Sequence, residues 1–327
     1  MKVIRLGNDP IISPLSHPEA GPNIQGPSLI RVPEWIENPL GQYYLYFADH
    51  KGAYIRLAYA DDPRGPWVLH TPGSLQLADS LFPTKAPPVP PGGVEKVRAA
   101  LAKAGINLDN LEHDLIKEMT APHIASPDVH VNNINKSIVM YFHGLQGFGD
   151  QKTRVATSPD GINFTALPEI LGLTYFRVFK WRGWTYSLAM PGQFYRSKDG
   201  LSNFEKGPLL FNRNMRHSAV QVRGDTLYVY WTEVGETPEH IKLSTIELDR
   251  PWQDWHESAS QEILRPQLTW EGADQSLVPS VRSVAYKRVN QLRDPAIFED
   301  GEKTYLLYAI AGESGIAIAE VKYPKIY

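Results

Sequence analysis

The chain repeats one arrangement of apolar and polar positions five times. The clearest copy spans Ile124–Gly144, where an alternating strand that opens with Ser126–Asp128 is followed by a polar turn and the apolar strand Ile138–Phe142. An unbroken apolar run of β-forming residues predicts a strand that is buried on both faces. The same order of strand, tight turn, buried strand, third strand and aromatic-containing turn recurs in four more units. The five units begin near residues 28, 126, 176, 217 and 294.

Five such units of about 40–50 residues predict an all-β fold, a five-bladed β-propeller forming a single domain. A β-sandwich, the alternative all-β fold, does not require the same order of strands and turns to occur five times. We expect Lys2–Leu6 to close the ring as the outer strand of the last blade. Residues 79–122 interrupt the repeat with a proline-rich run and two predicted helices, Val94–Ala104 and Leu108–Met119, the second capped by Asp109. This insertion either forms a lid over one face of the propeller or is a solvent-exposed addition that covers nothing.

Composition narrows the possible partners. The 327 residues carry a net charge of −3 without a long basic run, which argues against nucleic acid and anionic membranes. The chain has no cysteine, which excludes disulfides and thiolate chemistry.

No run approaches 18 apolar residues and the first ten residues lack an apolar signal segment, so we expect no membrane partner. The expected location is the cytoplasm, or the periplasm or exterior if a leader was removed. The oligomeric state is left open.

Polar or ionisable residues stand at the starts of the strands expected to line the propeller channel. Because the first residues of inner strands gather at one mouth, we expect six side chains to meet in one hollow: Asn23, Gln25, Asp128, Arg177, His217 and Asp294. Charged groups ahead of apolar strands indicate a site. The structural alternatives are turn-capping by the two aspartates, a hydrogen-bonded channel histidine, and an internal salt bridge between Arg177 and Asp128.

Three of these phrases resemble glycoside hydrolase family 43. Ala125–His130 followed by Met140–Phe142 is similar to the family's APDVHY and YYLYYS phrase. Arg293–Pro295 followed by Tyr305–Tyr308 resembles the DP-strand phrase of the superfamily, and Arg216–Val220 resembles its GHGSV phrase. The resemblance implies a five-bladed propeller, a carbohydrate substrate, and catalysis by an Asp base, a pKa-tuning Asp and a Glu acid.

The expected catalytic triad is incomplete in this chain. By the resemblance, Asp128 falls on the pKa-tuning Asp and His217 on the channel histidine. Gly26-Pro27 stands where the family has the Asp-Pro of the base, and Thr174–Arg177 stands in place of the Glu phrase. Either the groups have been relocated, or the chemistry has been lost or changed.

If the catalytic groups have been relocated, other residues must act as the base and the acid. Asp294, beside the first blade around the ring, is expected to be the base, and His217 the proton donor. Glu233 is the best replacement for the missing acid. Arg177 is expected to hold substrate or to lower the pKa of Asp128. Further substrate-binding candidates are Asn23, Gln25, His50, His123, His143, Gln151, Arg216 and Arg293.

The resulting hypothesis is hydrolysis of a small oligosaccharide or glycoside from one end. A phosphorylase or lyase on the same scaffold is an alternative, in which arginines bind phosphate or a uronate carboxylate. A non-catalytic sugar-binding propeller is another. No cofactor is expected. Family members sometimes hold a channel calcium ion, but the histidines here show no metal-binding spacing.

Overall fold

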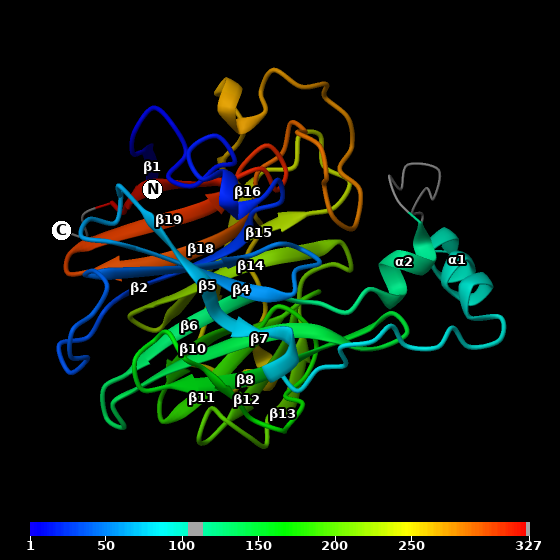
Figure 1. Cartoon of the computed structure of the whole chain (residues 1–327), viewed down its shortest axis with the longest axis horizontal. Helices are drawn as coiled ribbons and strands as arrows, with labels where there is room; N and C mark the ends of the chain where they lie inside the picture. The colour runs from blue at the N-terminus through cyan, green and yellow to red at the C-terminus, as the bar shows by residue number, and fades with distance from the viewer. Residues whose placement is uncertain (104–113, 325–327) are drawn as a thin grey trace.

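Residues 1–103 and 114–324 are described by the computed structural model, and their strands form five four-stranded antiparallel sheets. The sheets are arranged as the blades of a propeller (Figure 1). The predicted five-bladed β-propeller is therefore confirmed. Each blade runs outward from an inner strand, and neighbouring strands are antiparallel.

The blades have the following strands. Blade 1 contains β2 (Gln25–Arg31), β3 (Tyr43–Ala48), β4 (Tyr54–Ala60) and β5 (Val68–Gln76). Blade 2 contains β6 (Ile124–Asn132), β7 (Ser137–Gly147), β8 (Asp150–Ser158) and β9 (Thr165–Ala166). Blade 3 contains β10 (Arg177–Trp181), β11 (Trp184–Ala189), β12 (Gln193–Ser197) and β13 (Glu205–Leu209). Blade 4 contains β14 (Met215–Arg223), β15 (Thr226–Glu233), β16 (Ile241–Glu247) and β17 (Gln261–Leu264). Blade 5 contains β18 (Arg293–Asp300), β19 (Lys303–Ala309), β20 (Ile316–Lys322) and β1 (Lys2–Arg5).

The ring is closed by the N-terminal strand. In the last blade β1 pairs antiparallel with β20, and Lys2 lies opposite Lys322 while Arg5 lies opposite Ala319. The two ends of the chain thus share one sheet, as the sequence predicts. This closure covers the outer edge of β20, which would otherwise present unpaired backbone groups.

The hydrophobic core lies between neighbouring blades. One cluster joins blades 1 and 2 around Tyr46 and Met140, and a second joins blades 1 and 5 around Leu45 and Leu307. Three further clusters fill the remaining junctions of the ring. The second strand of each blade is mostly buried, and β3 is buried along its whole length, because side chains on both faces pack against an adjacent blade. The apolar strands therefore hold the ring together and leave its axis to polar residues.

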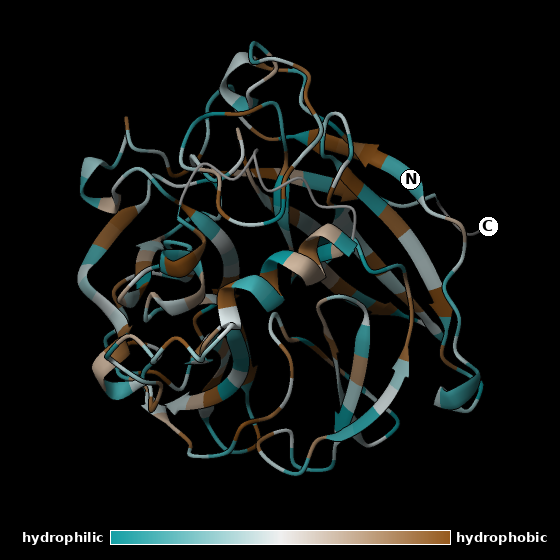
Figure 2. Cartoon of the chain, turned by 90° about the vertical axis from the view of Figure 1, so that its right-hand side faces the viewer, coloured by the Kyte–Doolittle hydropathy of each residue, from teal (hydrophilic) through white to brown (hydrophobic). Residues whose placement is uncertain are grey.

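The insertion between blades 1 and 2 is helical, with α1 (Gly93–Lys103) and α2 (Leu115–Thr120). Figure 2 shows a helical segment of this insertion in front of the centre of the ring. The N-cap of α2 is Asp114, whose carboxylate accepts a hydrogen bond of 2.8 Å from the N–H of Ile116. Residues 104–113, including the predicted cap Asp109 and the predicted start of the second helix, lie outside the described residues.

Single turns of 3-10 helix occur at Pro18–Ala20, Leu77–Asp79, Trp252–Asp254 and Thr269–Glu271. Within the described residues, no helix is long and apolar enough to cross a membrane.

Candidate active site

The inner strands begin with a repeated irregularity. The pairing register shifts between Gln25 and Ser28, between Ala125 and Asp128, and between Arg293 and Ala296, and a similar shift occurs in blade 4. The equivalent residues inside these bulges, Gly26, Ser126 and Asp294, have φ values of 63°, 50° and 46°. Bulges re-aim side chains, and left-handed non-glycine residues store strain that persists only when the surroundings impose it. Backbone strain at this mouth of the channel is therefore present in blades 2 and 5, at Ser126 and Asp294.

A covered cavity of about 160 Å³ lies at this mouth. Blade residues and insertion residues line it together, among them His50, Gln151, Tyr175, His217, Leu115 and Met119. The insertion is thus a lid over one face, which is the first of the two alternatives left by the sequence. The cavity is smaller than the roughly 300–1,000 Å³ of pockets for drug-sized ligands, so it fits a ligand the size of one sugar ring.

Asp294 and His217 form a buried pair beside this cavity. The backbone N–H of Asp294 donates to Nδ1 of His217 at 3.3 Å, and the carboxylate Oδ1 lies 3.3 Å from the same nitrogen. An N–H group can only donate, so Nδ1 accepts and the ring proton is assigned to Nε2. Neither oxygen of Asp294 has a hydrogen-bond partner among the described residues. In this pair the imidazole of His217 therefore lines the cavity, and the carboxyl group of Asp294 lies behind it.

Burial sets the protonation of this pair. Burial, and after it the charge of Glu313, raises the pKa of Asp294 to about 7. Burial, reinforced by Arg216 and Arg293, lowers the pKa of His217 well below its ordinary value. At neutral pH the imidazole is uncharged and the carboxyl group still holds a proton in about half of the molecules. The sequence interpretation of Asp294 as the base is thereby changed, because its proton is available for donation.

A second carboxyl–imidazole pair, Glu313 and His50, reaches the same cavity. Nδ1 of His50 lies 3.2 Å from Oε2 of the fully buried Glu313, whose other oxygen accepts from Arg293 at 2.8 Å. Asn23 donates to Oε2 at 2.9 Å and accepts from the backbone N–H of His50 at 2.8 Å. Burial opposes ionisation, but His50 and then Arg293 and Asn23 outweigh it and hold the pKa of Glu313 well below its ordinary range. The ionised carboxylate lies within hydrogen-bond distance of Nδ1 of His50 and so orients this ring.

Sequence reasoning missed Glu313. It lies in the connection between β19 and β20, and His50 lies in the equivalent connection between β3 and β4. A signal was available in the sequence, because His50 and His143 each follow a Tyr-Phe pair in successive blades, and extending this placement to blade 5 leads to this loop. The ion pair itself could not be predicted, because its partners are 263 residues apart.

Three more candidates form the wall next to His217. The His143 ring lies 4.5 Å from the Tyr175 ring, which lies 4.9 Å from the His217 ring, and His123 meets His143 edge-on at 6.0 Å. Burial lowers the pKa of His123 to about 3 and that of His143 well below its ordinary value, so both rings are neutral. Nε2 of His123, Nδ1 of His143 and Nε2 of Gln25 have no hydrogen-bond partner in the part of the chain that the structure describes. Buried polar atoms are normally paired, so this concentration at one mouth indicates a place for ligand or water.

The predicted arginine ligands are engaged elsewhere. Arg216 pairs with buried Glu239 at 3.3 Å and donates to the carbonyl of Ser283 at 3.1 Å. Arg293 pairs with Glu313. A buried guanidinium needs such partners, which occupy the donors that the sequence interpretation gave to substrate. Among the described residues, no three His, Asp or Glu side chains form a group suited to a metal ion.

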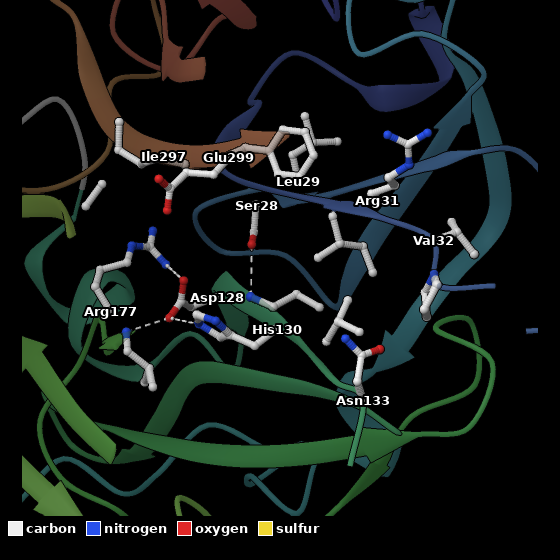
Figure 3. Close-up of a pocket in the computed structure, with 18 of the residues that line it drawn as sticks. Ser28, Leu29, Arg31, Val32, Asp128, His130, Asn133, Arg177, Ile297 and Glu299 are labelled. Carbon is white, nitrogen blue, oxygen red and sulfur yellow. Dashed lines mark hydrogen bonds and ion pairs between the residues drawn. The ribbon is translucent and has the colours of Figure 1, made fainter. Parts of the chain in front are cut away.

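Asp128 and Arg177 face a different hollow, of about 650 Å³ (Figure 3). Oδ2 of Asp128 accepts from Nε2 of His130 and from the N–H of Val178, each at 2.8 Å, and Nη1 of Arg177 lies 3.9 Å from Oδ1. Burial would raise the pKa of Asp128, but His130 and then Arg177 outweigh it and lower the pKa. Arg177 is fixed by the carbonyls of Ser218 and Pro127, each at 2.9 Å.

The expectation that Asp128, Arg177, His217 and Asp294 share one hollow is therefore wrong. The register places Asp294 at the bulge position of Ser126, whereas Asp128 lies two residues further along its strand. Two residues are about 6–7 Å of strand, which moves Asp128 toward the opposite mouth. Glu233 is also elsewhere, since it pairs with Lys242 and accepts from Asn212 at 2.9 Å.

A sequence comparison places this architecture in a family. No family model matches the chain. An uncharacterized protein of Acanthamoeba polyphaga mimivirus is 34% identical over 325 residues, covering 91% of this chain and 83% of the viral protein. The chain belongs to the family of this viral protein. Because that relative is uncharacterized, membership in the family carries no activity with it.

Solved structures show which fold the family has. A putative glycoside hydrolase from Bacteroides ovatus matches 98% of this chain and 96% of its own, with a TM-score of 0.60 and 12% identity. A GH43 β-xylosidase/α-arabinofuranosidase from a compost microbial metagenome, crystallised with xylotriose, matches the same shares at a TM-score of 0.59 and 12% identity. A GH43_1 enzyme from Xanthomonas citri matches 97% and 91%, with a TM-score of 0.58 and 12% identity. The chain therefore has the fold of these five-bladed glycoside hydrolases.

Proposed function

We propose that the protein hydrolyses a glycosidic bond in the covered cavity. In this proposal the Asp294–His217 pair donates the proton and the Glu313–His50 pair accepts one. The supporting observation is that two carboxyl–imidazole pairs with opposite protonation meet at one cavity. Titratable pairs whose environments push their pKa values apart are the usual sign of divided acid and base roles.

The proposed reaction needs two proton transfers. His217 gives the Nε2 proton to the glycosidic oxygen while Nδ1 takes the proton of Asp294, so the bond from the anomeric carbon to that oxygen breaks. A water molecule forms the new bond to the anomeric carbon and loses a proton to Nε2 of His50. Glu313 stabilises the resulting imidazolium, as a carboxylate does in a catalytic triad. After product release, solvent takes the proton from His50 and returns one to Nε2 of His217, whose Nδ1 then gives its proton back to Asp294.

The cavity also bears on the size of the substrate. The lid residues Leu115 and Met119 line the cavity together with His50 and His217, and the space is about 160 Å³. A space of this size suits one terminal sugar ring, which supports action at the end of a glycoside. The structural neighbours include enzymes crystallised with xylose and xylotriose, and this supports a carbohydrate as the ligand.

A glycoside panel tests the proposal. We expect at least one aryl glycoside or disaccharide to release free sugar, and His50→Gln to lower its turnover by roughly 10²–10⁴-fold, the usual contribution of a general base. The matched control is His70→Gln, which changes a half-buried histidine of β5 in the same blade and should retain full turnover. Released sugar is measured by chromatography.

Two other outcomes would reject hydrolysis. Sugar binding without product after long incubation would identify a non-catalytic sugar-binding propeller. Product that forms only when phosphate is added, and appears as a sugar phosphate, would identify a phosphorylase.

A further inference from the structure

The cations around the covered cavity are almost all neutralised by their own acids. Each of three positively charged side chains has a carboxylate within 4 Å. These pairs are Lys51–Glu118 at 3.1 Å, Arg216–Glu239 at 3.3 Å and Arg293–Glu313 at 2.8 Å, and Arg293 also lies 3.6 Å from Glu239. Pairing with an acid is what a buried cluster of charges requires, since an unpaired charge away from water is costly.

Arg282 breaks this pattern. It lines the cavity together with Arg216, His217 and Ser283, and it is half-buried. Its one hydrogen bond is from Nη2 to the backbone carbonyl of Arg213, at 3.0 Å, and it has no carboxylate partner in residues 1–103 and 114–324. Burial and then the neighbouring charge of Arg216 lower the pKa of Arg282 to about 10, a value at which it is still charged at neutral pH.

The backbone next to Arg282 is held in an unusual conformation. Ser283 has a φ of 96°, and its carbonyl accepts from Nη2 of Arg216 at 3.1 Å and from Nη1 of Arg293 at 3.2 Å. Two buried arginines thus fix the connector on the C-terminal side of Arg282. Strain that surrounding groups impose is typical of ligand-binding segments. The guanidinium of Arg282, which has no carboxylate within 4 Å among the described residues, is consequently presented to the cavity by an anchored backbone.

We propose that Arg282 forms an anion subsite within the cavity, beside the Asp294–His217 pair. The ligand is an oxyanion, either the carboxylate of a sugar acid or a free phosphate ion that acts with the sugar. An arginine fork matches either group geometrically. The placement of a sugar next to this subsite rests on the proposed function, whereas the binding of the anion does not.

Isothermal titration calorimetry on the full chain tests the subsite, with glucuronate, galacturonate, the two parent hexoses and inorganic phosphate as probes. We expect one anionic probe to bind roughly tenfold or more tightly than the neutral hexoses, because a hydrogen-bonded ion contact is worth at least that much. Arg282→Gln should abolish this preference. Arg265→Gln, which changes an exposed arginine of the same connector paired with Glu262, should retain it within about twofold.

Thermal unfolding separates loss of binding from loss of folding. Arg282→Gln removes a half-buried charge that has no acid partner, so its Tm should equal or exceed that of the wild type. A preference for uronates identifies a sugar acid, and a preference for phosphate identifies the free ion. Equal binding of anionic and neutral probes, or an anion preference that survives Arg282→Gln, would overturn the subsite.

The two proposals fail in different ways. Anion binding that depends on Arg282, without turnover of any glycoside, would keep the subsite and reject the hydrolase. Turnover of glycosides, without any anion preference that depends on Arg282, would reject the subsite and keep the hydrolase.

Discussion

Replacing Asp294 with Asn should lower the turnover of an accepted glycoside by about 10²–10⁴-fold, the range typical of a lost general acid. The neutral imidazole of His217 is a poor acid by itself, and Asp294 supplies the proton that it passes on. Wild-type turnover should fall as the pH rises through about 7, because the carboxyl group then loses its proton. The residual turnover of Asp294→Asn should lack that basic limb. Initial rates across pH measure both effects.

The leaving group provides the control for this prediction. A dinitrophenyl glycoside needs little protonation as it departs, so Asp294→Asn should lose much less of its turnover on that substrate than on a disaccharide. Asp274→Asn, a change in an exposed loop outside the cavity, should leave both rates unchanged. Equal losses on the two substrates would contradict a role for Asp294 in proton donation.

The same substitution has a predicted effect on stability. The pKa of Asp294 rises from 3.8 in the unfolded chain to about 7 in the fold, a shift of about 3 pH units. The folded state therefore binds more protons than the unfolded state in this window, and wild-type stability should fall between pH 4 and pH 7. At ~1.4 kcal/mol per unit, the loss is at most about 4 kcal/mol. Urea unfolding of Asp294→Asn at the two pH values should lack this decline.

Glu313→Gln should reduce the free energy of unfolding by about 3–5 kcal/mol, the usual cost of leaving a buried charge without its partner. The substitution removes the carboxylate from Arg293 and from His50, and both side chains are buried. Because the folded pKa of Glu313 lies below the unfolded one, its contribution is present above about pH 4.5 and is lost on acidification. Glycoside turnover should also fall, since His50 loses its orienting acceptor. Urea unfolding at pH 7 and pH 4 measures the stability effects.

A surface ion pair is the matched control for Glu313→Gln. Asp62 pairs with Arg64 at 2.8 Å, and both side chains are largely exposed. Asp62→Asn should therefore change the free energy of unfolding by no more than about 1 kcal/mol. If Glu313→Gln were as mild as this control, the buried network around His50 would not have the energetic importance assigned to it.

The fold was predictable because its information is local. Apolar strands such as Ile138–Phe142 recur with the same turns, and a period repeated five times leaves few alternatives to a propeller. The N-terminal strand that closes the ring could be predicted in the same way, because the last of the five predicted blades needed an outer strand. The second helix of the insertion was predicted from propensity alone; the N-cap of α2 is Asp114, and the proposed cap Asp109 lies outside the described residues. Several acidic residues there can serve as caps, and propensity does not choose between them.

The site was predictable only in part because its contacts are long-range. Asp294, His217, His50 and Asn23 were recognised as polar residues next to apolar strands. Their roles depend on Glu313, which lies 263 residues from His50, and on bulges that separate Asp128 from Asp294. Arg282 lies in a connector without periodicity, so no pattern marked it. Its possible role becomes apparent only when an acidic partner has been identified for each neighbouring positively charged side chain.

The protonation of Asp294 decides whether the Asp294–His217 pair can donate a proton. The carboxyl carbons of a ¹³C-aspartate-labelled protein can be titrated by NMR, and the resonance that is missing from Asp294→Asn belongs to this residue. We predict a midpoint at about pH 7, produced by burial and by the charge of Glu313. A midpoint near the ordinary value of 3.8 would contradict the proposed proton donor.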